Sequence, residues 1–400
     1  MAGDHTVAYE PVGVKDVLAE MKDTAELLID LSYSAVLLGD DEVAGEVLEL
    51  ERRMDVLQLR ARMSLLMAAR SPDDAEALAP VLGVVGAAEK ISDAAGDIAK
   101  VVVEAVGLPE AMRAALPEAV EAVVRADLAS DSPLADRTLG DIDLETETGV
   151  RAIAVRRGGD WLLNPDAETA LRGGDVVLLR GPPDGIDAVY ADATGRAYER
   201  PEPAQREIDD LERAVDSIVT MKNMAELAVD LAYGAVLFDS DDLAEEVLEL
   251  EAEVDALQSR FEAWTLRAAA GVADPVSLRG LVHLAAATEV ISDAAVEISE
   301  GVLRGLGTHP VVAEAVEDSD EVIVRVVVGA DAPLAGTTIG EFAVATETGM
   351  RVIAVRRMAE DGDDWVVSPG PRTALSVDDT LIAKGTRTGA GRLRELAGEE

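Results

Sequence analysis

The stretch that decides the fold is LADRTLGDIDLETETGVRAIAVRR, residues 134–157. It returns 200 positions later as LAGTTIGEFAVATETGMRVIAVRR, residues 334–357, with 14 of the 24 positions identical. A match of this length at a fixed offset indicates an internal duplication, which has to be recognised before any fold is assigned. The chain therefore divides into two related halves.

Each copy of this stretch predicts part of a small sheet. Thr138 is expected to cap a short helix that runs from Leu139 to about Thr146, and its counterpart Thr338 is expected to do the same. β-Branched and apolar runs bounded by glycine turns predict the strands. The predicted strands of the first copy are Val120–Leu128, Val150–Arg157, Trp161–Leu163 and Val176–Arg180, and those of the second include Glu321–Val328, Trp365–Val367 and Thr380–Lys384.

The spaced pattern PLAxxTxG…TGxRxIAVRR…P…GD resembles the TrkA-C domain, also called the C-terminal RCK domain, of potassium-uptake and cation-channel regulators. The resemblance covers about 75 residues in each half. It implies a small α/β sandwich that senses a ligand or forms dimers. The nucleotide-binding half of an RCK unit is missing, because no G-x-G-x-x-G follows a strand.

The sequence before each sheet predicts three long helices. Apolar residues keep helical spacing from Val14 to Leu38, and the turn at 39–41 ends that helix and caps the next. Ser71 and Pro72 start a third helix, whose apolar stripe is expected to reach Ala105. The second helix has a seam with spacings of three and four residues, which is typical of packed helices. The seam positions are Val47, Leu50, Met54, Leu57 and Ala61, repeated as Val247, Leu250, Val254, Leu257 and Phe261.

These helices resemble a PhoU domain, a three-helix unit of phosphate-uptake regulators. The family's acidic motif, Glu/Asp-x-x-x-Asp, is matched twice in each half. Carboxylates four residues apart project from one side of a helix, and a bound divalent or transition metal would relieve their repulsion. The alternative is a solvated acidic face. The candidate metal ligands are Glu26, Asp30, Glu89, Asp93, Glu226, Asp230, Glu289 and Asp293.

We therefore predict an α+β fold that is internally duplicated. Two three-helix antiparallel bundles of PhoU type alternate with two small α/β sandwich-type TrkA-C domains, and the halves pack about a pseudo-two-fold axis. The predicted domains are residues 11–107, 116–192, 206–307 and 318–388, with a linker at 193–205 and a frayed tail or helix end over the last dozen residues.

The composition is strongly acidic. Seventy-nine Asp and Glu residues oppose 35 Lys and Arg, so the net charge is −44. Such a surface repels nucleic acid and anionic membranes, and its self-repulsion fades in concentrated salt. With 48% hydrophobic residues and no cysteine, the chain is expected to be a folded halophilic protein of haloarchaeal type, without disulfides or zinc–thiolate sites. No signal peptide or membrane span is expected, which places the protein in the cytoplasm.

No catalytic constellation is recognisable. The three histidines are His5, His283 and His309, and none has a nucleophile at a recognisable spacing. His283 lies in an Ala/Leu-rich helix and is expected to pack there. We therefore expect no enzymatic activity and name no catalytic residue.

A ligand site is expected in the TrkA-C units. The resemblance places a small regulatory ligand such as cyclic di-AMP near Arg156, whose guanidinium fork suits phosphate. We expect one ligand to be shared by both copies, although the arginines could instead pair with local acids. The candidate ligand-binding residues are Arg156, Asn164, Pro165, Arg356, Ser368 and Pro369.

The resemblances imply a soluble regulatory subunit of a potassium or other cation transport system. Its partners would be a membrane transporter or channel, which could hold the protein at the membrane, and a second copy of the chain as a homodimer. The alternative is a PhoU-type regulator of phosphate uptake.

Overall fold

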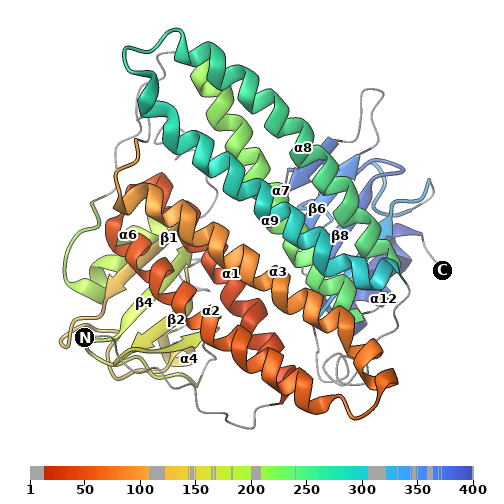
Figure 1. Cartoon of the computed structure of the whole chain (residues 1–400), viewed down its shortest axis with the longest axis horizontal. Helices are drawn as coiled ribbons and strands as arrows, with labels where there is room; N and C mark the ends of the chain where they lie inside the picture. The colour runs from red at the N-terminus through yellow and green to blue at the C-terminus, as the bar shows by residue number, and fades with distance from the viewer. Residues whose placement is uncertain are drawn as a thin grey trace.

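The structure is a computed structural model. It describes residues 13–107, 122–142, 144, 148, 150–163, 165, 168–181, 183–199, 209–238, 240–304, 321–330, 332–342, 344, 348, 350–357, 364–367, 369–370 and 372–398. Two three-helix bundles lie side by side, and a four-stranded sheet packs against each bundle (Figure 1). The predicted α+β architecture and its duplication are confirmed.

The first bundle consists of α1 (Val14–Leu38), α2 (Asp41–Ala68) and α3 (Pro72–Val103). Gly39 ends α1 with a left-handed φ of 63°, a conformation that glycine adopts without steric cost. The side chain of Asp40 then caps α2 by accepting the N–H groups of Glu42 and Val43. Ser71 caps α3 in the same way, so the predicted boundaries between these helices are confirmed.

The second bundle repeats this plan with α7 (Asp209–Phe238), α8 (Asp241–Ala269) and α9 (Arg279–Leu303). A 3-10 turn, η2 (Pro275–Leu278), precedes α9. All ten predicted seam residues of α2 and α8 face the core, and only Leu257 among them is half-buried rather than buried.

Two predictions about these helices were wrong. The helix α3 ends at Val103, and Ala105 lies beyond it, exposed and with a positive φ of 49°. His283 is exposed on α9 rather than packed. The buried residues next to it are Leu281, Leu284 and Ala285. Because a helix turns once every 3.6 residues, a residue that lies between buried positions in the sequence can still face the solvent.

The first sheet has the strand order β1-β4-β2-β3 and is antiparallel throughout. Its strands are β1 (Ala122–Asp127), β2 (Arg151–Arg157), β3 (Asp160–Leu163) and β4 (Val176–Gly181). The second sheet has the equivalent order β5-β8-β6-β7, with β5 (Glu321–Val327), β6 (Met350–Arg357), β7 (Asp364–Val367) and β8 (Thr380–Thr386). The predicted strands are therefore confirmed in both copies.

The sheet domains also contain short helices. The capped helix α4 covers Leu139–Ile142, and Thr138 accepts the N–H of Asp141 as expected; residues 143, 145 and 146 of the predicted helix lie outside the described residues. A helix that was not predicted, α6 (Pro183–Thr194), covers the first sheet. Near the end of the chain, where a frayed tail or a helix end was predicted, α12 (Arg387–Ala397) forms a helix that packs on β5.

Each sheet separates two apolar layers. Because successive strand residues face opposite sides, Val123 faces the bundle while Val124 joins the core beneath α6. Ala154, Trp161 and Leu178 also join the bundle core. The sheet domain is thereby fixed to its bundle by a shared hydrophobic core.

The two halves meet along α3 and α9, which run antiparallel at the centre of Figure 1. The carbonyl of Gly107, just beyond α3, accepts the N–H of Gly280 near the start of α9 at 2.9 Å. At the other end, a Cβ added to Gly301 would lie only 2.9 Å from Pro80, so the backbones approach closely there. This reciprocal contact of equivalent helices fits the expected pseudo-two-fold arrangement.

Among the helices that the structure describes, none is both long enough and apolar enough to cross a membrane.

Candidate functional site

The bundle-facing side of the first sheet carries arginines on three strands. Arg125 on β1, Arg156 on β2 and Arg180 on β4 occupy positions of the same parity as the buried residues Val123, Ala154 and Leu178. The alternation of the strands therefore turns all three cations toward the helices. Each meets a carboxylate of a bundle.

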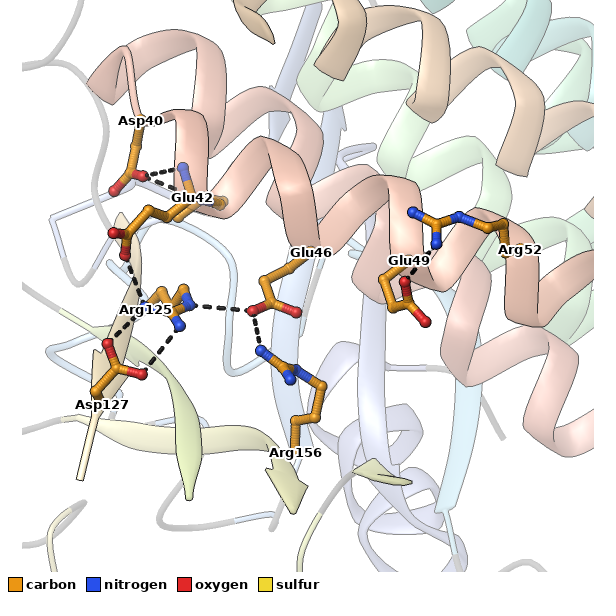
Figure 2. Close-up of polar contacts among 9 residues, drawn as sticks. Asp40, Glu42, Glu46, Glu49, Arg52, Arg125, Asp127 and Arg156 are labelled. Carbon is orange, nitrogen blue, oxygen red and sulfur yellow. Dashed lines mark hydrogen bonds and ion pairs between the residues drawn. The ribbon is translucent and has the colours of Figure 1, made fainter. Parts of the chain in front are cut away.

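The first of these contacts centres on Glu46 of α2, which is buried (Figure 2). Its Oε1 accepts a hydrogen bond from Arg125 Nε at 3.0 Å and one from Arg156 Nη2 at 2.5 Å. The other guanidinium nitrogens of Arg125 bind Asp127 on the same strand, and one of them also binds Glu42 of α2. One buried carboxylate thus joins two strands of the sheet to the helix; we call this contact the first junction.

The second junction has the same geometry. Oε1 of the buried Glu246 accepts hydrogen bonds from Arg325 Nε at 2.7 Å and from Arg356 Nη2 at 3.0 Å. One difference follows from a substitution between the halves. In the first half Glu49 pairs with Arg52 on the surface of α2, whereas position 252 is alanine and Glu249 pairs with Arg356.

An indole lies under each junction arginine. The guanidinium carbon of Arg156 is 5.8 Å from the ring centre of Trp161, and that of Arg356 is 5.8 Å from the ring centre of Trp365. Both tryptophans are buried, so these cation–π contacts help to hold the arginines toward the glutamates.

The neighbouring arginine, Arg157, faces the other way and has a structural role. It binds both carboxylate oxygens of the buried Asp175, at 2.8 and 2.6 Å, and donates to the carbonyl of Ala170. Arg357 repeats this with Asp379 and the carbonyl of Ala374. Burial alone would raise the pKa of Asp175, but the Arg157 guanidinium and the N–H of Arg172 outweigh burial and lower it.

Arg180 reaches the boundary between the two bundles, which we call the seam from here on. Its Nη1 lies 2.7 Å from Oδ2 of Asp30 on α1, and its Nη2 lies 3.9 Å from Oε1 of Glu226 on α7. Burial and the nearby Glu226 carboxylate raise the pKa of Asp30 to about 7. Burial acts in the same direction on Glu226, but Lys222 and Arg180 lower the pKa of Glu226 to about 2. We call this group of four charges the seam cluster.

The predicted metal ligands lie in two groups. One group is on α1 and α7, at or near the seam cluster, and the other is on α3 and α9. Asp30 and Glu226 belong to the seam cluster, and Glu26 pairs with Lys22. Glu89 pairs with Arg62, whereas Glu289 accepts a hydrogen bond from Gln258. Burial and the carboxylates of Glu89, Asp55 and Asp97 raise the pKa of Asp93, as burial and neighbouring acids also do for Asp293. Within the described part of the chain, no three carboxylate or imidazole groups lie close enough together to hold a metal ion.

The predicted ligand residues are also separated. Arg156 and Arg356 each bind a glutamate of their own half, so the contact with local acids is the alternative that the geometry favours. Asn164 and Ser368 lie outside the described residues, while Pro165 and Pro369 are half-buried after the short strands β3 and β7.

Sequence reasoning missed Glu46 and Glu246, although a signal was present. Both open the identical run EVLELE, at 46–51 and 246–251, and Arg125 and Arg325 recur at the same offset. A charged residue three positions after a buried apolar residue such as Val43 falls on the buried side of a helix. A repeated buried charge needs a repeated partner of opposite charge.

Two family models match the chain, each of them twice. The TrkA-C domain matches residues 123–193 and 323–398, and the PhoU domain matches residues 18–102 and 218–302. The chain carries PhoU and TrkA-C domains in tandem. Both domains are of a regulatory type rather than enzymatic families. The junctions are therefore contacts between a TrkA-C sheet and a PhoU bundle.

Solved structures give weaker likenesses. A crystal structure of PhoU from Pseudomonas aeruginosa is 15% identical, with a TM-score of 0.42 over 73% of this chain and 96% of that one. The GsuK RCK domain is 15% identical, with a TM-score of 0.19 over 70% of this chain and 64% of that one. The human SLO3 gating ring is 9% identical, with a TM-score of 0.23 over 68% and 67%. Likenesses at these scores carry no argument about function. No curated protein matches the chain in sequence.

Proposed function

We propose that the protein is a cytoplasmic regulatory subunit of a potassium or other cation transport system, held at the membrane by its transporter. The observation that carries the proposal is the pair of junctions. In each half of the chain, a buried glutamate joins the TrkA-C sheet to the PhoU bundle. A movement of either sheet is therefore passed on to the helices next to it. Regulation requires such contact between a sensing domain and a docking domain.

Capture of partners from membranes tests this proposal. The full chain, immobilised in high KCl, should retain a potassium or other cation transporter. A chain with Glu46→Gln alone, shown by its thermal melt to be folded under the assay conditions, should retain the same transporter but should fail to restore fully regulated potassium uptake in cells that lack the wild-type protein. Capture without any cation transporter contradicts the proposal.

The second candidate is a PhoU-type regulator of phosphate uptake. The observation in its favour is that both bundles match the PhoU domain over residues 18–102 and 218–302. The same capture experiment separates the two functions, because a phosphate transporter would be retained instead and phosphate uptake rather than potassium uptake would change in cells without the protein.

The ligand of the TrkA-C domains is a further part of the proposal. Cyclic di-AMP would bind Arg156 and Arg356 through its phosphates, in competition with Glu46 and Glu246. Since these arginines lie in separate halves, their placement supports one ligand per TrkA-C domain rather than the single shared ligand expected from the sequence. Calorimetry gives the stoichiometry. Arg156→Ala should weaken binding to the first domain about tenfold or more, and Glu46→Gln should strengthen it.

Metal binding by the bundles is a separate proposal. It is supported by the mutual repulsion of Asp93, Glu89 and Asp55, which a divalent cation would relieve by drawing these side chains together. Metal analysis after dialysis in high KCl should show a retained transition metal. Asp93→Asn should remove it from the first bundle only, and a metal-free wild type leaves these faces as solvated acidic surfaces.

A further inference from the structure

Arg180 differs from the other arginines on the bundle-facing side of the first sheet. Arg125 and Arg156 bind Glu46, which belongs to their own half of the chain. The Arg180 guanidinium instead lies 2.7 Å from Asp30 of the first bundle and 3.9 Å from Glu226 of the second. One side chain of the first sheet therefore contacts the first bundle and the second at their seam.

The charges of the seam cluster come from three elements. Helix α1 supplies Asp30, helix α7 supplies Glu226 and Lys222, and strand β4 supplies Arg180. When Asp30 carries a proton, its carboxyl group donates a hydrogen bond across the seam to the Glu226 carboxylate. Two carboxylates from opposite halves are thus held together by one cation from the sheet and one from the second bundle. Without the sheet's cation, the two carboxylates would face one ammonium group.

We propose that the first TrkA-C sheet sets the packing of the two PhoU bundles through Arg180, so that a ligand or partner that shifts this sheet opens or tightens the contact between α1 and α7. The proposal rests on the proposed function only for the claim that the TrkA-C sheet is the sensing part. The coupling between sheet and bundles is a property of the chain by itself.

The second sheet differs at the equivalent position. Arg180 pairs with Val123 in the register of the first sheet, and Lys384 pairs with Ile323 in that of the second. A planar guanidinium presents several donors and can bind two carboxylates at once, whereas an ammonium group acts as a single point charge. The bundles are duplicated, but the residue type at this position of the sheet is not, and the coupling proposed here is that of Arg180.

Hydrogen exchange of the full chain, followed by mass spectrometry in high KCl, tests the coupling. Amides in a helix exchange when the helix opens locally, so the rate reports the stability of its packing. Arg180→Gln should speed exchange several-fold in the segment 222–230 of α7, because Glu226 loses its ion pair with Arg180 and Asp30 loses its hydrogen-bonded counter-charge beside it. The decisive point is that this segment lies in a domain to which Arg180 does not belong.

Arg125→Gln is the matched control. It removes an arginine from the same face of the same sheet, but one whose partners Glu46, Glu42 and Asp127 all lie in the first half. It should speed exchange in β1 and α2 and leave residues 222–230 unchanged. If Arg125→Gln accelerates α7 as much as Arg180→Gln does, the effect is general loosening and the proposal is wrong.

A milder variant keeps the test informative if Arg180→Gln does not fold. Arg180→Lys copies the residue type of the second sheet and keeps the charge, and it should accelerate the same α7 segment by a smaller factor. Wild-type exchange in α7 with either Arg180 variant overturns the proposal. No transporter takes part in the hydrogen-exchange assay. A negative result in this assay therefore does not bear on the capture experiment. A negative capture experiment, in turn, does not contradict the coupling through Arg180.

Discussion

At the scale of single residues, Glu46 shows how a buried charge joins two domains. It lies on the core side of α2 and has two guanidinium partners, so its desolvation is offset by short charge-assisted hydrogen bonds. Removing one member of a buried ion pair leaves the other members without a counter-charge. Glu46→Gln should therefore lower the free energy of unfolding by about 3 kcal/mol, measured by denaturant titration in high KCl.

Two matched variants sharpen this prediction. Glu49→Gln removes a carboxylate that pairs with Arg52 on the exposed surface, and should cost at most about 0.5 kcal/mol. Glu249→Gln should cost more than Glu49→Gln, because Glu249 pairs with the largely buried Arg356. Equal costs for Glu46→Gln and Glu49→Gln would contradict the role of the junction.

Asp175 makes the first TrkA-C domain sensitive to acid. Its pKa is lower in the folded chain than in the unfolded chain, because Arg157 and the N–H of Arg172 stabilise the carboxylate. The stabilisation is therefore present above the unfolded pKa of about 3.9 and is lost as the pH falls through that value toward the lower folded pKa. Thermal melts across that range should show a steeper loss of stability in the wild type than in Asp175→Asn. Asp131→Asn, at an exposed position, should keep the wild-type slope.

The residues of the candidate site were only partly predictable. The pattern TGxRxIAVRR identified Arg156 and Arg356 as unusual, because the sequence repeats them at a fixed offset. Their partners Glu46 and Glu246 lie 110 positions earlier, and local periodicity carries no information on which distant helix covers a sheet. The direction of Arg180 toward the second half depends in addition on how the bundles pack.

At the scale of elements, α12 is a packed helix where the sequence predicted a frayed tail or a helix end. Its Ala390, Leu393 and Ala397 are buried against the second sheet. Leu393→Ala should lower the free energy of unfolding by about 3 kcal/mol, because it opens a cavity in that core. Arg394→Ala, one residue later and exposed, should stay within about 0.5 kcal/mol of the wild type in the same denaturant titration. Equal effects would mean that α12 is not packed in solution.

The composition of α6 and α12 explains why α6 was not predicted and why α12 was predicted only as a frayed tail or a helix end. The segment PDGIDAVYADAT of α6 and the segment RTGAGRLRELA of α12 both contain glycine inside the helix, which lowers helix propensity. Tertiary packing on a sheet overrides that preference. By contrast, α1, α2 and α3 carry local caps at Gly39, Asp40 and Ser71, and their boundaries could be read from the sequence.

At the scale of the whole molecule, the net charge of −44 decides how stability depends on salt. Exposed acids repel one another over distances that shrink as the Debye length falls to about 3 Å at 1 M salt. The buried junctions at Glu46 and Glu246 are screened much less, because little water or salt reaches them. Raising KCl should therefore weaken the repulsion more than it weakens the contacts between sheets and bundles. We predict that the melting temperature rises from dilute buffer to molar KCl.

A local charge variant distinguishes screening from a general effect of solutes on hydrophobic burial. Asp93 lies against Asp55 and Glu89 on one bundle face, so Asp55→Asn with Asp93→Asn removes part of the repulsion that salt would otherwise screen. This double variant should melt higher than the wild type in dilute buffer, and its melting temperature should rise less with KCl. Sorbitol at matched osmolality should raise both proteins equally. A wild-type melting temperature that is flat or falls across the KCl series would show that the acidic surface is not an adaptation to concentrated salt.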